Sequence, residues 1–474
     1  AIIFDHEQNV LAKVYREFTQ FFPKPGWVEH DPEEIWQSTA AVIRQAITEA
    51  GIQAQDIAAA GITNQRETVM LWDEQTGEPV ANAICWQCRR TADYCEKLKQ
   101  QGLEQKLFDK TGLYIDAYFS ASKLHWLLER HPYRPGMKAG TVDTWILWRL
   151  TGGNVHATEP SNASRTLLYN IHTLAWDDEL LEVFGVPRDI LPEVKPSDAH
   201  FGSIDPAHFG ASIPVCGILG DQQASMFAQG CYGPGVFKNT YGTGCFLLTN
   251  VGERPVASKH LLLSTVAWQA AGKTEYALEG SIFIGGAAVQ WLRDGLQIIE
   301  TAAESEALMN ALPDNEGVYF VTALAGLGAP HWDMDARGLM IGLTRGTTRA
   351  HIVRATLESL AYRSRDVLEA MSAELETEIK ALQVDGGASA NDALMQFQAD
   401  LIQTEVVRPQ VIETTALGAA YMAGISAGFW QNRDEVVRHR HVGKTFRPQR
   451  DKAEMEHYYA KWRQAVERSH AWEE

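Results

Sequence analysis

The sequence predicts an α/β protein of two lobes with a central cleft. At about 150 residues per domain, a chain of 474 residues is too long for one compact core. Apolar strand-like runs alternate with amphipathic helical stretches, which is typical of α/β proteins. Each half also contains a strand that ends in an aspartate-containing turn before a helix, at 220–223 and at 385–388. We therefore expect a first lobe at residues 1–228 and a second lobe at residues 229–474, which ends in a helical tail.

The first clear helix is expected to follow Asp31. Asp31 is a candidate N-cap, Pro32 suits the first helical position, and Glu34 is placed to complete a capping box. Apolar residues then recur with helical spacing until Gly51, namely Trp36, Ala40, Ile43 and Ile47.

Buried strands are expected at 57–63, 68–72 and 213–219, with a helix beginning near Ala224. The stretch at 153–209 is rich in Trp, Pro and Asp and predicts shorter elements.

In the second half, the longest helix is expected to start near His351. Its stripe consists of Val353, Leu357, Leu360, Val367 and Met371. A strand at 381–384 leads into the next turn, a helix begins at Asn391, and a charged helical tail occupies 453–472.

Charge and composition exclude several functions. The 60 acidic residues outnumber the 42 lysines and arginines, and a net charge of −18 argues against a nucleic-acid partner. No run approaches the roughly 18 to 20 apolar residues of a membrane-spanning helix, so no membrane insertion is expected. The start of the chain does not resemble a secretory signal, and six cysteines are few for its length, so we expect a cytoplasmic protein. Cys85 and Cys88 form a CxxC pattern, which we interpret as two free thiols because no second pair follows.

Three glycine-rich turns suggest that a phosphate-containing ligand binds the second half, at 241–244, 285–288 and 386–388. Glycine lets the backbone come close to an anion, and helix amino termini favour negative charge. Neither a P-loop nor a GxGxxG motif is present. Three such turns together favour a nucleotide, although each one alone is explained by backbone geometry.

Asp221 is the strongest catalytic candidate. It follows an apolar strand, at the carboxyl end where open α/β sheets place their ligands. There it suits a general base for a hydroxyl that attacks a phosphate, and it suits a Mg²⁺ ligand. A helix N-cap is the alternative role for the same residue.

Arg66 and Glu67 lie between two buried strands. They suit either an ordinary ion pair or a polar clamp that exchanges hydrogen bonds with a polyol. Trp86, Tyr118 and Phe246 suit either the core or the apolar wall that a small polyol needs.

Long motifs give the chain a family resemblance. They are 22–31, 61–68, 86–91, 162–166, 220–223, 238–246, 290–294 and 342–346. In these motifs the chain resembles the glycerol-phosphorylating members of the FGGY carbohydrate-kinase family, which belongs to the superfamily of sugar kinases, actin and heat-shock ATPases. The resemblance implies two actin-like (ribonuclease H-like) lobes and ATP-dependent phosphorylation of glycerol to sn-glycerol 3-phosphate with Mg²⁺.

The resemblance also implies roles for single residues. Hydrogen bonds to glycerol are expected from Arg66, Glu67, Tyr118, Asp221 and the adjacent Gln222, and apolar contacts from Trp86 and Phe246. Asp221 would be the general base and the metal ligand. The expected phosphate contacts are Gly242 and Thr243, and the expected adenosine contacts are Gly286, Gln290, Gly387 and Asn391. A homodimer or homotetramer is expected from the family.

One departure from the family pattern concerns the opening segment. Family members begin with a strand and an Asp-Gln-Gly-Thr-Thr-Ser-x-Arg turn before the strand that is residues 1–5 here, so the first lobe is expected to lack its opening hairpin strand. That turn supplies phosphate donors, and the chain as it stands is expected to be close to inactive. Two alternatives stay open. One is another FGGY kinase that acts on a longer sugar, and the other, suggested by the absent turn, is an inactive regulator that binds a polyol or a nucleotide.

Overall fold

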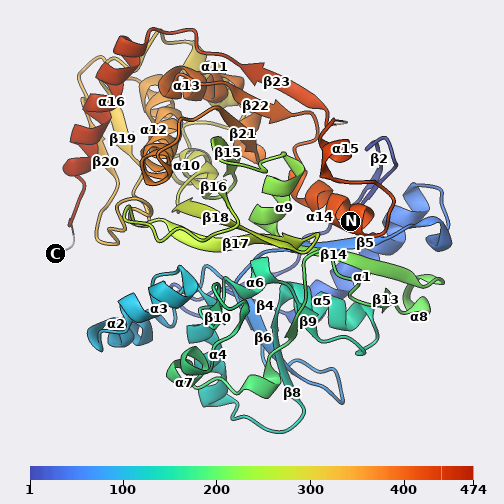
Figure 1. Ribbon diagram of the computed structural model, residues 1–474. Coiled ribbons are helices and arrows are strands. Elements are labelled where there is room, and N and C mark those ends of the chain that lie inside the picture. Colours follow the sequence, from blue (N-terminus) through green and yellow to red (C-terminus); the bar gives the residue numbers. More distant parts are fainter. Residues whose placement is uncertain (439, 473–474) are drawn as a thin grey trace.

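The computed structural model describes residues 1–438 and 440–472 and contains two α/β lobes, as predicted (Figure 1). The first lobe is built on a five-stranded sheet with strand order β3-β4-β7-β6-β8. Its strands are β3 (Gln20–Phe21), β4 (Glu29–His30), β7 (Ala83–Ile84), β6 (Val69–Asp73) and β8 (Met137–Thr141). The helices around it are α1 (Pro32–Glu49), α2 (Ala92–Gln100), α3 (Glu104–Thr111), α4 (Ser120–Arg130), α5 (Val142–Leu150), α6 (Pro160–Ala163), α7 (Asp178–Phe184) and α8 (Pro206–Phe209).

A three-stranded sheet lies where the lobes meet. Its order is β13 (Ser203–Ile204), β14 (Ile213–Gly220) and β5 (Ala60–Asn64), with β14 and β5 parallel. Two helices cover it, namely α9 (Asp221–Ala228) and α14 (Thr414–Ser426). The approach of α14 is close, because a Cβ on Gly61 would lie 2.2 Å from the carbonyl oxygen of Ala419. A helix from the end of the chain therefore packs on strands of the first lobe.

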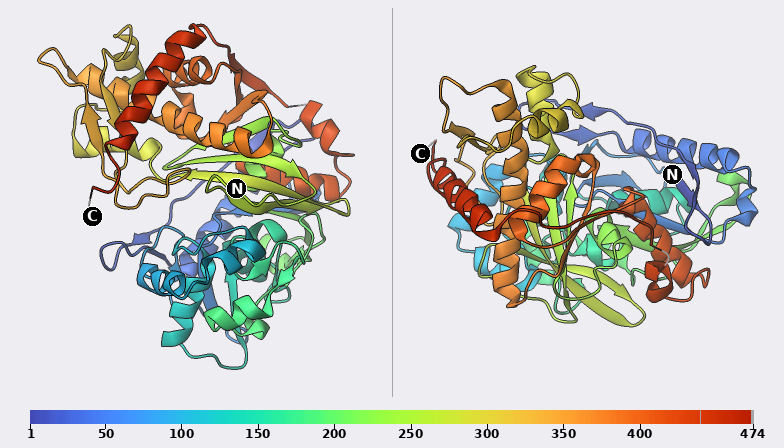
Figure 2. Two further views of the ribbon diagram at one scale, coloured as in Figure 1. Left: turned by 60° about the vertical axis from the view of Figure 1, so that its left-hand side comes forward. Right: turned by 90° about the horizontal axis from the view of Figure 1, so that it is seen from above.

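The second lobe is built on a seven-stranded sheet in which two neighbouring strand pairs are parallel, β15 with β21 and β21 with β22. Its order is β17 (Leu263–Ala270), β18 (Lys273–Ile282), β16 (Cys245–Gly252), β15 (Val236–Tyr241), β21 (Ala381–Asp385), β22 (Val406–Pro409) and β23 (Val442–Phe446). Its helices are α10 (Gly286–Gln290), α11 (Glu304–Asn310), α12 (Arg349–Leu375), α13 (Asp392–Ile402), α15 (Arg433–Arg438) and α16 (Lys452–Glu467). The views in Figure 2 show α16 on the outside of this lobe. The largest apolar core joins the sheet to α12, α13 and α16 through residues such as Leu382, Leu360 and Trp462.

Four two-stranded sheets complete the fold. They are β1 (Ile2–Phe4) with β2 (Val10–Lys13), β9 (Ala157–Thr158) with β12 (Glu193–Val194), β10 (Tyr169–Asn170) with β11 (Ala175–Trp176), and β19 (Tyr319–Val321) with β20 (Leu339–Ile341). Within residues 1–438 and 440–472, no helix is long and apolar enough to cross a membrane. All six cysteines are free and buried.

Most predicted helices form, with different boundaries. Asp31 caps α1 by accepting from the backbone N–H of Glu33 at 2.8 Å, but the predicted capping box is wrong. The Glu34 carboxylate instead accepts from the backbone N–H and the hydroxyl of Thr19, both at 3.1 Å.

Two helices begin earlier than expected. The long helix α12 begins at Arg349, because the ring of His351 accepts the backbone N–H of its N-cap Thr348. Helix α9 begins at Asp221, with Gly220 as the N-cap, so the alternative role of Asp221 as an N-cap is wrong.

Candidate active site

The parallel pairing of β5 and β14 brings the strongest predicted residues together. Asn64 and Gly220, which end the two strands, lie opposite each other in the ladder. Arg66 and Asp221 follow these ends, and the Nε atom of Arg66 lies 3.2 Å from Oδ1 of Asp221. The site therefore lies at the carboxyl edge of this sheet, as expected for open α/β sheets.

Glu67 occupies a strained turn just after β5. Its φ of 61° lies in the left-handed region, and the N–H of Thr68 donates to the carbonyl oxygen of Arg66 at 2.7 Å. A three-residue turn of this hand is rare, and such strain is concentrated at functional sites. Two adjacent charged side chains are thereby held in one buried place.

Arg66 and Glu67, the two clamp residues, form a buried charged network with Arg165 and Glu279. Glu279 on β18 accepts from both terminal nitrogens of Arg66, at 2.6 and 3.2 Å, and from Nη2 of Arg165 at 3.0 Å. Arg165 also donates from Nε to Glu67 at 2.6 Å. All four side chains are at most 2% exposed. Sequence analysis missed both Arg165 and Glu279.

Burial and ion pairing oppose each other in this network. Burial alone would raise the pKa of Glu279, but Arg165 and Arg66 overcome it and lower that pKa to about 2. For Glu67 burial dominates over the same two arginines and raises its pKa. Glu279 is therefore the carboxylate that neutralises the two guanidinium groups most strongly.

Three predicted aromatic residues form one wall. The ring centroid of Trp86 lies 5.7 Å from that of Tyr118 and 6.1 Å from that of Phe246, in edge-to-face arrangements. The guanidinium of Arg165 lies over the Tyr118 ring at 5.3 Å. The wall thus adjoins the charged network, as a polyol site requires.

Several polar atoms next to this wall have no hydrogen-bond partner within the described residues. They are Oδ2 of Asp221, Oε2 of Glu67 and the hydroxyl of Tyr118. The side chain of Asp221 is 31% exposed. These atoms can receive or donate hydrogen bonds with ligand hydroxyl groups.

The glutamines after Asp221 point to different partners. The amide oxygen of Gln222 accepts from the buried Lys238 on β15 at 2.5 Å, so this oxygen faces the second lobe. Gln223, which sequence analysis did not select, accepts from Nη1 of Arg66 at 3.2 Å. The helical register after Asp221 sets this division, and sequence motifs do not reveal it.

A second group of predicted residues gathers in the other lobe. The N–H of Gly286 donates to the carbonyl oxygen of Gly242 at 2.7 Å, and that of Gly285 donates to Thr243 at 2.8 Å. A Cβ on Gly286 would lie 2.8 Å from the Gly242 oxygen, so only glycine fits there. Gly386, with φ of 83°, approaches Tyr241 just as closely. Three glycine turns therefore meet at the carboxyl ends of β15 and β21.

The other predicted nucleotide residues border these turns. Gly387 is exposed with open space beside it, and Gln290 is exposed at the end of α10. Asn391 caps α13, where its Oδ1 accepts from the N–H of Leu394 at 2.9 Å. The side chain of Asn391 is therefore already engaged.

The donors for Mg²⁺ are few. Within the described residues no cluster of three His, Cys, Asp or Glu side chains could hold a metal. Mg²⁺ is usually bound by one or two carboxylates together with substrate phosphates and water. The unpartnered Oδ2 of Asp221 fits that pattern, whereas Asp385 accepts hydrogen bonds from Ser225, Gln229, Thr240 and Thr414.

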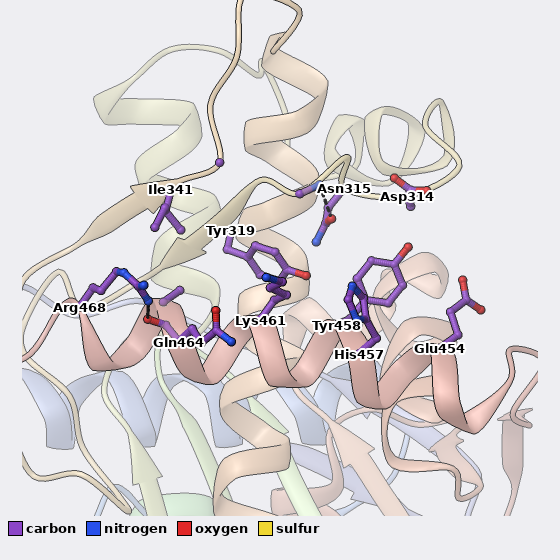
Figure 3. Close-up of a pocket in the computed structure, with 13 residues that line it drawn as sticks. Asp314, Asn315, Tyr319, Ile341, Glu454, His457, Tyr458, Lys461, Gln464 and Arg468 are labelled. Atoms are coloured by element: carbon purple, nitrogen blue, oxygen red, sulfur yellow. Dashed lines mark hydrogen bonds between the residues drawn. The ribbon is translucent and has the colours of Figure 1, made fainter.

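A pocket of about 500 Å³ lies elsewhere, above α16 and beside β19 and β20 (Figure 3). It is lined by Asp314, Asn315, Gly317, Tyr319, Ile341, Gly342, Glu454, His457, Tyr458, Lys461, Gln464, Ala465 and Arg468. None of the predicted site residues lines it.

The structure has two α/β lobes, a buried charged network beside an aromatic wall, and three glycine turns in the second lobe, an arrangement that fits the class of two-lobed sugar phosphotransferases. Residues 1–228 match the N-terminal domain, and residues 237–427 the C-terminal domain, of the FGGY family of carbohydrate kinases. The chain belongs to this family.

Relatives are similar over the whole chain. "Glycerol kinase 2" of Thermotoga maritima is 56% identical over 479 residues, which cover 100% of this chain and 97% of that protein. A glycerol kinase of Caldanaerobacter subterraneus subsp. tengcongensis is 55% identical over 480 residues, with the same shares. The crystal structure of Plasmodium falciparum glycerol kinase with ADP superposes with a TM-score of 0.91 at 35% identity, over 99% of this chain and 95% of that one.

Two signals for the missed residues were present in the sequence. Around Glu279, β18 alternates Glu275, Glu279 and Ser281 with apolar residues, and a carboxylate in so apolar a strand needs a buried partner. Arg165 stands in a motif, 162–166, that was used only for the resemblance.

Proposed function

We propose that this protein transfers the γ-phosphoryl group of ATP to glycerol and forms sn-glycerol 3-phosphate. The observation that carries the proposal is the pairing of Arg66 with the partly exposed Asp221, whose Oδ2 is unpartnered, beside the aromatic wall. Relatives named glycerol kinase that are 55–56% identical over the full chain support the choice of acceptor.

Asp221 acts as the general base in this proposal. The Oδ2 atom of Asp221 takes the proton from one glycerol hydroxyl. The glycerol oxygen forms a bond to the γ-phosphorus at the same time, and the bond between this phosphorus and the bridging oxygen of ADP breaks. Arg66, Glu67 and Tyr118 hold the hydroxyls, with Gln222 beside them. Trp86 and Phe246 cover the carbon edge of glycerol.

The second lobe, residues 229–474, binds the nucleotide. Gly242 and Thr243 contact its phosphates with backbone and hydroxyl groups, because glycine lets the backbone come close to an anion. Gly286, Gln290, Gly387 and Asn391 surround the adenosine. The first lobe, residues 1–228, supplies most of the glycerol contacts, and Phe246 comes from the second lobe.

Asp221 would hold Mg²⁺ through one of the ion's water ligands, with the ATP phosphates bound directly, so that Oδ2 stays free to take the proton, and the ion would supply charge neutralisation at those phosphates. Six reduced, buried thiols and the use of ATP support a cytoplasmic location. A homodimer or homotetramer is the assembly that we propose.

An ADP-release assay tests the proposal on the protein with the opening strand and turn of the family pattern in place before residue 1, with glycerol, xylulose and gluconate offered in parallel. We expect release with glycerol alone. Turnover with a sugar but not glycerol would reassign the substrate, and glycerol binding in calorimetry without turnover with any acceptor would indicate a binding protein.

A further inference from the structure

Glu279 joins the two lobes at the clamp. It lies on β18 in the seven-stranded sheet of the second lobe, whereas both of its arginine partners belong to the first lobe. Its side chain is fully buried. No other carboxylate bridges Arg66 and Arg165 by hydrogen bonds in the part of the chain that the structure describes.

The contacts of Arg66 show what this carboxylate does. Both terminal nitrogens of Arg66 donate to Glu279, in the two-pronged geometry that fixes the plane of a guanidinium. With that plane fixed, Nε faces Asp221 at 3.2 Å. The orientation of the clamp toward the base is therefore set from the other lobe.

β18 is packed tightly into the second lobe, which fixes the position of Glu279. Its Leu278 and Ile282 lie in the main core, and a Cβ on Gly280 would lie 2.3 Å from Val367 of α12. Beyond Ile282 the chain reaches Gly285 and the turn that bonds to Thr243. β18 thus carries the carboxylate that holds Arg66 and leads, three residues after its end, into the glycine turn at Gly285.

Stability is a poor explanation for such a network. Buried ion pairs often contribute no more than apolar residues of the same volume, because both charges lose their hydration. A role in fixing the direction of a ligand-binding arginine better explains why these charges are buried despite their lost hydration.

We propose that Glu279 is a positioning residue, which acts through Arg66 to orient the polyol clamp and ties that clamp to the nucleotide lobe. This rests on the proposed function. Because Arg66 contacts ligand hydroxyls in both the ground and transition states, loss of its orientation raises KM for the polyol more than it lowers kcat.

The test compares Glu279→Gln with Glu279→Asp and with a matched control, Glu275→Gln. Glu275 lies on the same strand, is 9% exposed and bonds to Asn250 and Arg433, away from the clamp. We expect Glu279→Gln to raise KM for glycerol about ten-fold or more, as loss of a supporting partner does at other sites, while KM for ATP stays within about two-fold of the control. Glu279→Asp, which keeps the charge but is shorter, should fall in between.

Three results would overturn the proposal. They are a glycerol KM for Glu279→Gln equal to that of Glu275→Gln, parallel changes in both KM values, and changes that only follow the folded fraction measured by thermal unfolding. If Glu279→Gln does not fold, Glu279→Asp decides by the same comparison. Inactivity on glycerol of the protein with its opening strand and turn in place refutes the proposed function instead, and the comparison is then made with the polyol or sugar that this protein binds in calorimetry.

Discussion

Replacing Asp221 with Asn tests the base directly, because the change removes charge and basicity but little else. Asn keeps an oxygen that can accept from the N–H of Gln222, as Oδ1 does now at 2.7 Å. Arg66 keeps its two bonds to Glu279. Since the Asp221 side chain is 31% exposed, the lost ion pair should cost about 1 kcal/mol of stability or less.

The effect on turnover should be far larger. A positioned general base contributes about 10²–10⁴-fold, which corresponds to about 3–5 kcal/mol in the barrier. We expect kcat for Asp221→Asn to fall within that range, while the glycerol Kd from calorimetry changes by only a few-fold. The ADP-release assay measures the first quantity.

Asp178→Asn is the matched control, because Asp178 also begins a helix and pairs with an arginine, Arg188, at 2.6 Å, but it is exposed and away from the site. Its kcat should equal that of the wild type. A kcat for Asp221→Asn within about five-fold of this control would refute the role of Asp221, because so small a loss lies below the range for a general base.

Four further predictions concern the other groups. Arg66→Ala leaves Glu279 with one arginine, so we expect glycerol binding to weaken about 100-fold in calorimetry and stability to fall by about 3–5 kcal/mol in urea unfolding; unchanged affinity would contradict the clamp. Phe246→Ala removes part of the wall and should raise KM for glycerol about ten-fold, with KM for ATP as the internal control. Gly386→Ala places a Cβ 2.6 Å from the Tyr241 oxygen at φ of 83°, so nucleotide affinity and thermal stability should both fall while glycerol affinity holds. The pKa of Glu279 is lowered from 4.5 to about 2, so its ionised carboxylate stabilises the fold above pH 4.5, and this stabilisation is lost as the pH falls toward 2. The difference in unfolding free energy between wild type and Glu279→Gln should therefore narrow by about 1 kcal/mol from pH 7 to pH 4 in urea unfolding. A difference that stays constant with pH would contradict the ion pairing of Glu279.

The sequence was sufficient for the parts of the site that depend on strand ends. Arg66 and Asp221 each follow an apolar run. Parallel pairing of two such strands brings their carboxyl ends together independently of the packing elsewhere in the fold. The glycine turns were predictable for a different reason, because the spacing of glycines before a helix is a local property of the sequence.

Partners that depend on the packing of the two lobes were not predictable. Glu279 meets Arg66 across 213 residues of chain, and nothing local to either residue indicates the other. Helix α9 begins earlier than its apolar residues suggested, because Gly220 provides the cap and turns Gln223 toward Arg66. Likewise Glu34 is taken by Thr19 rather than by its own helix.

The central claim is phosphoryl transfer to glycerol, and the identity of the product tests it most directly. Phosphorus NMR of the protein with its opening strand and turn in place, mixed with ATP, Mg²⁺ and glycerol, follows every phosphorus atom at once. We predict that the γ-phosphate signal is replaced by that of glycerol 3-phosphate in equal amount with ADP, without inorganic phosphate. Inorganic phosphate as the sole product, or an unchanged spectrum beside glycerol that binds in calorimetry, would contradict the account.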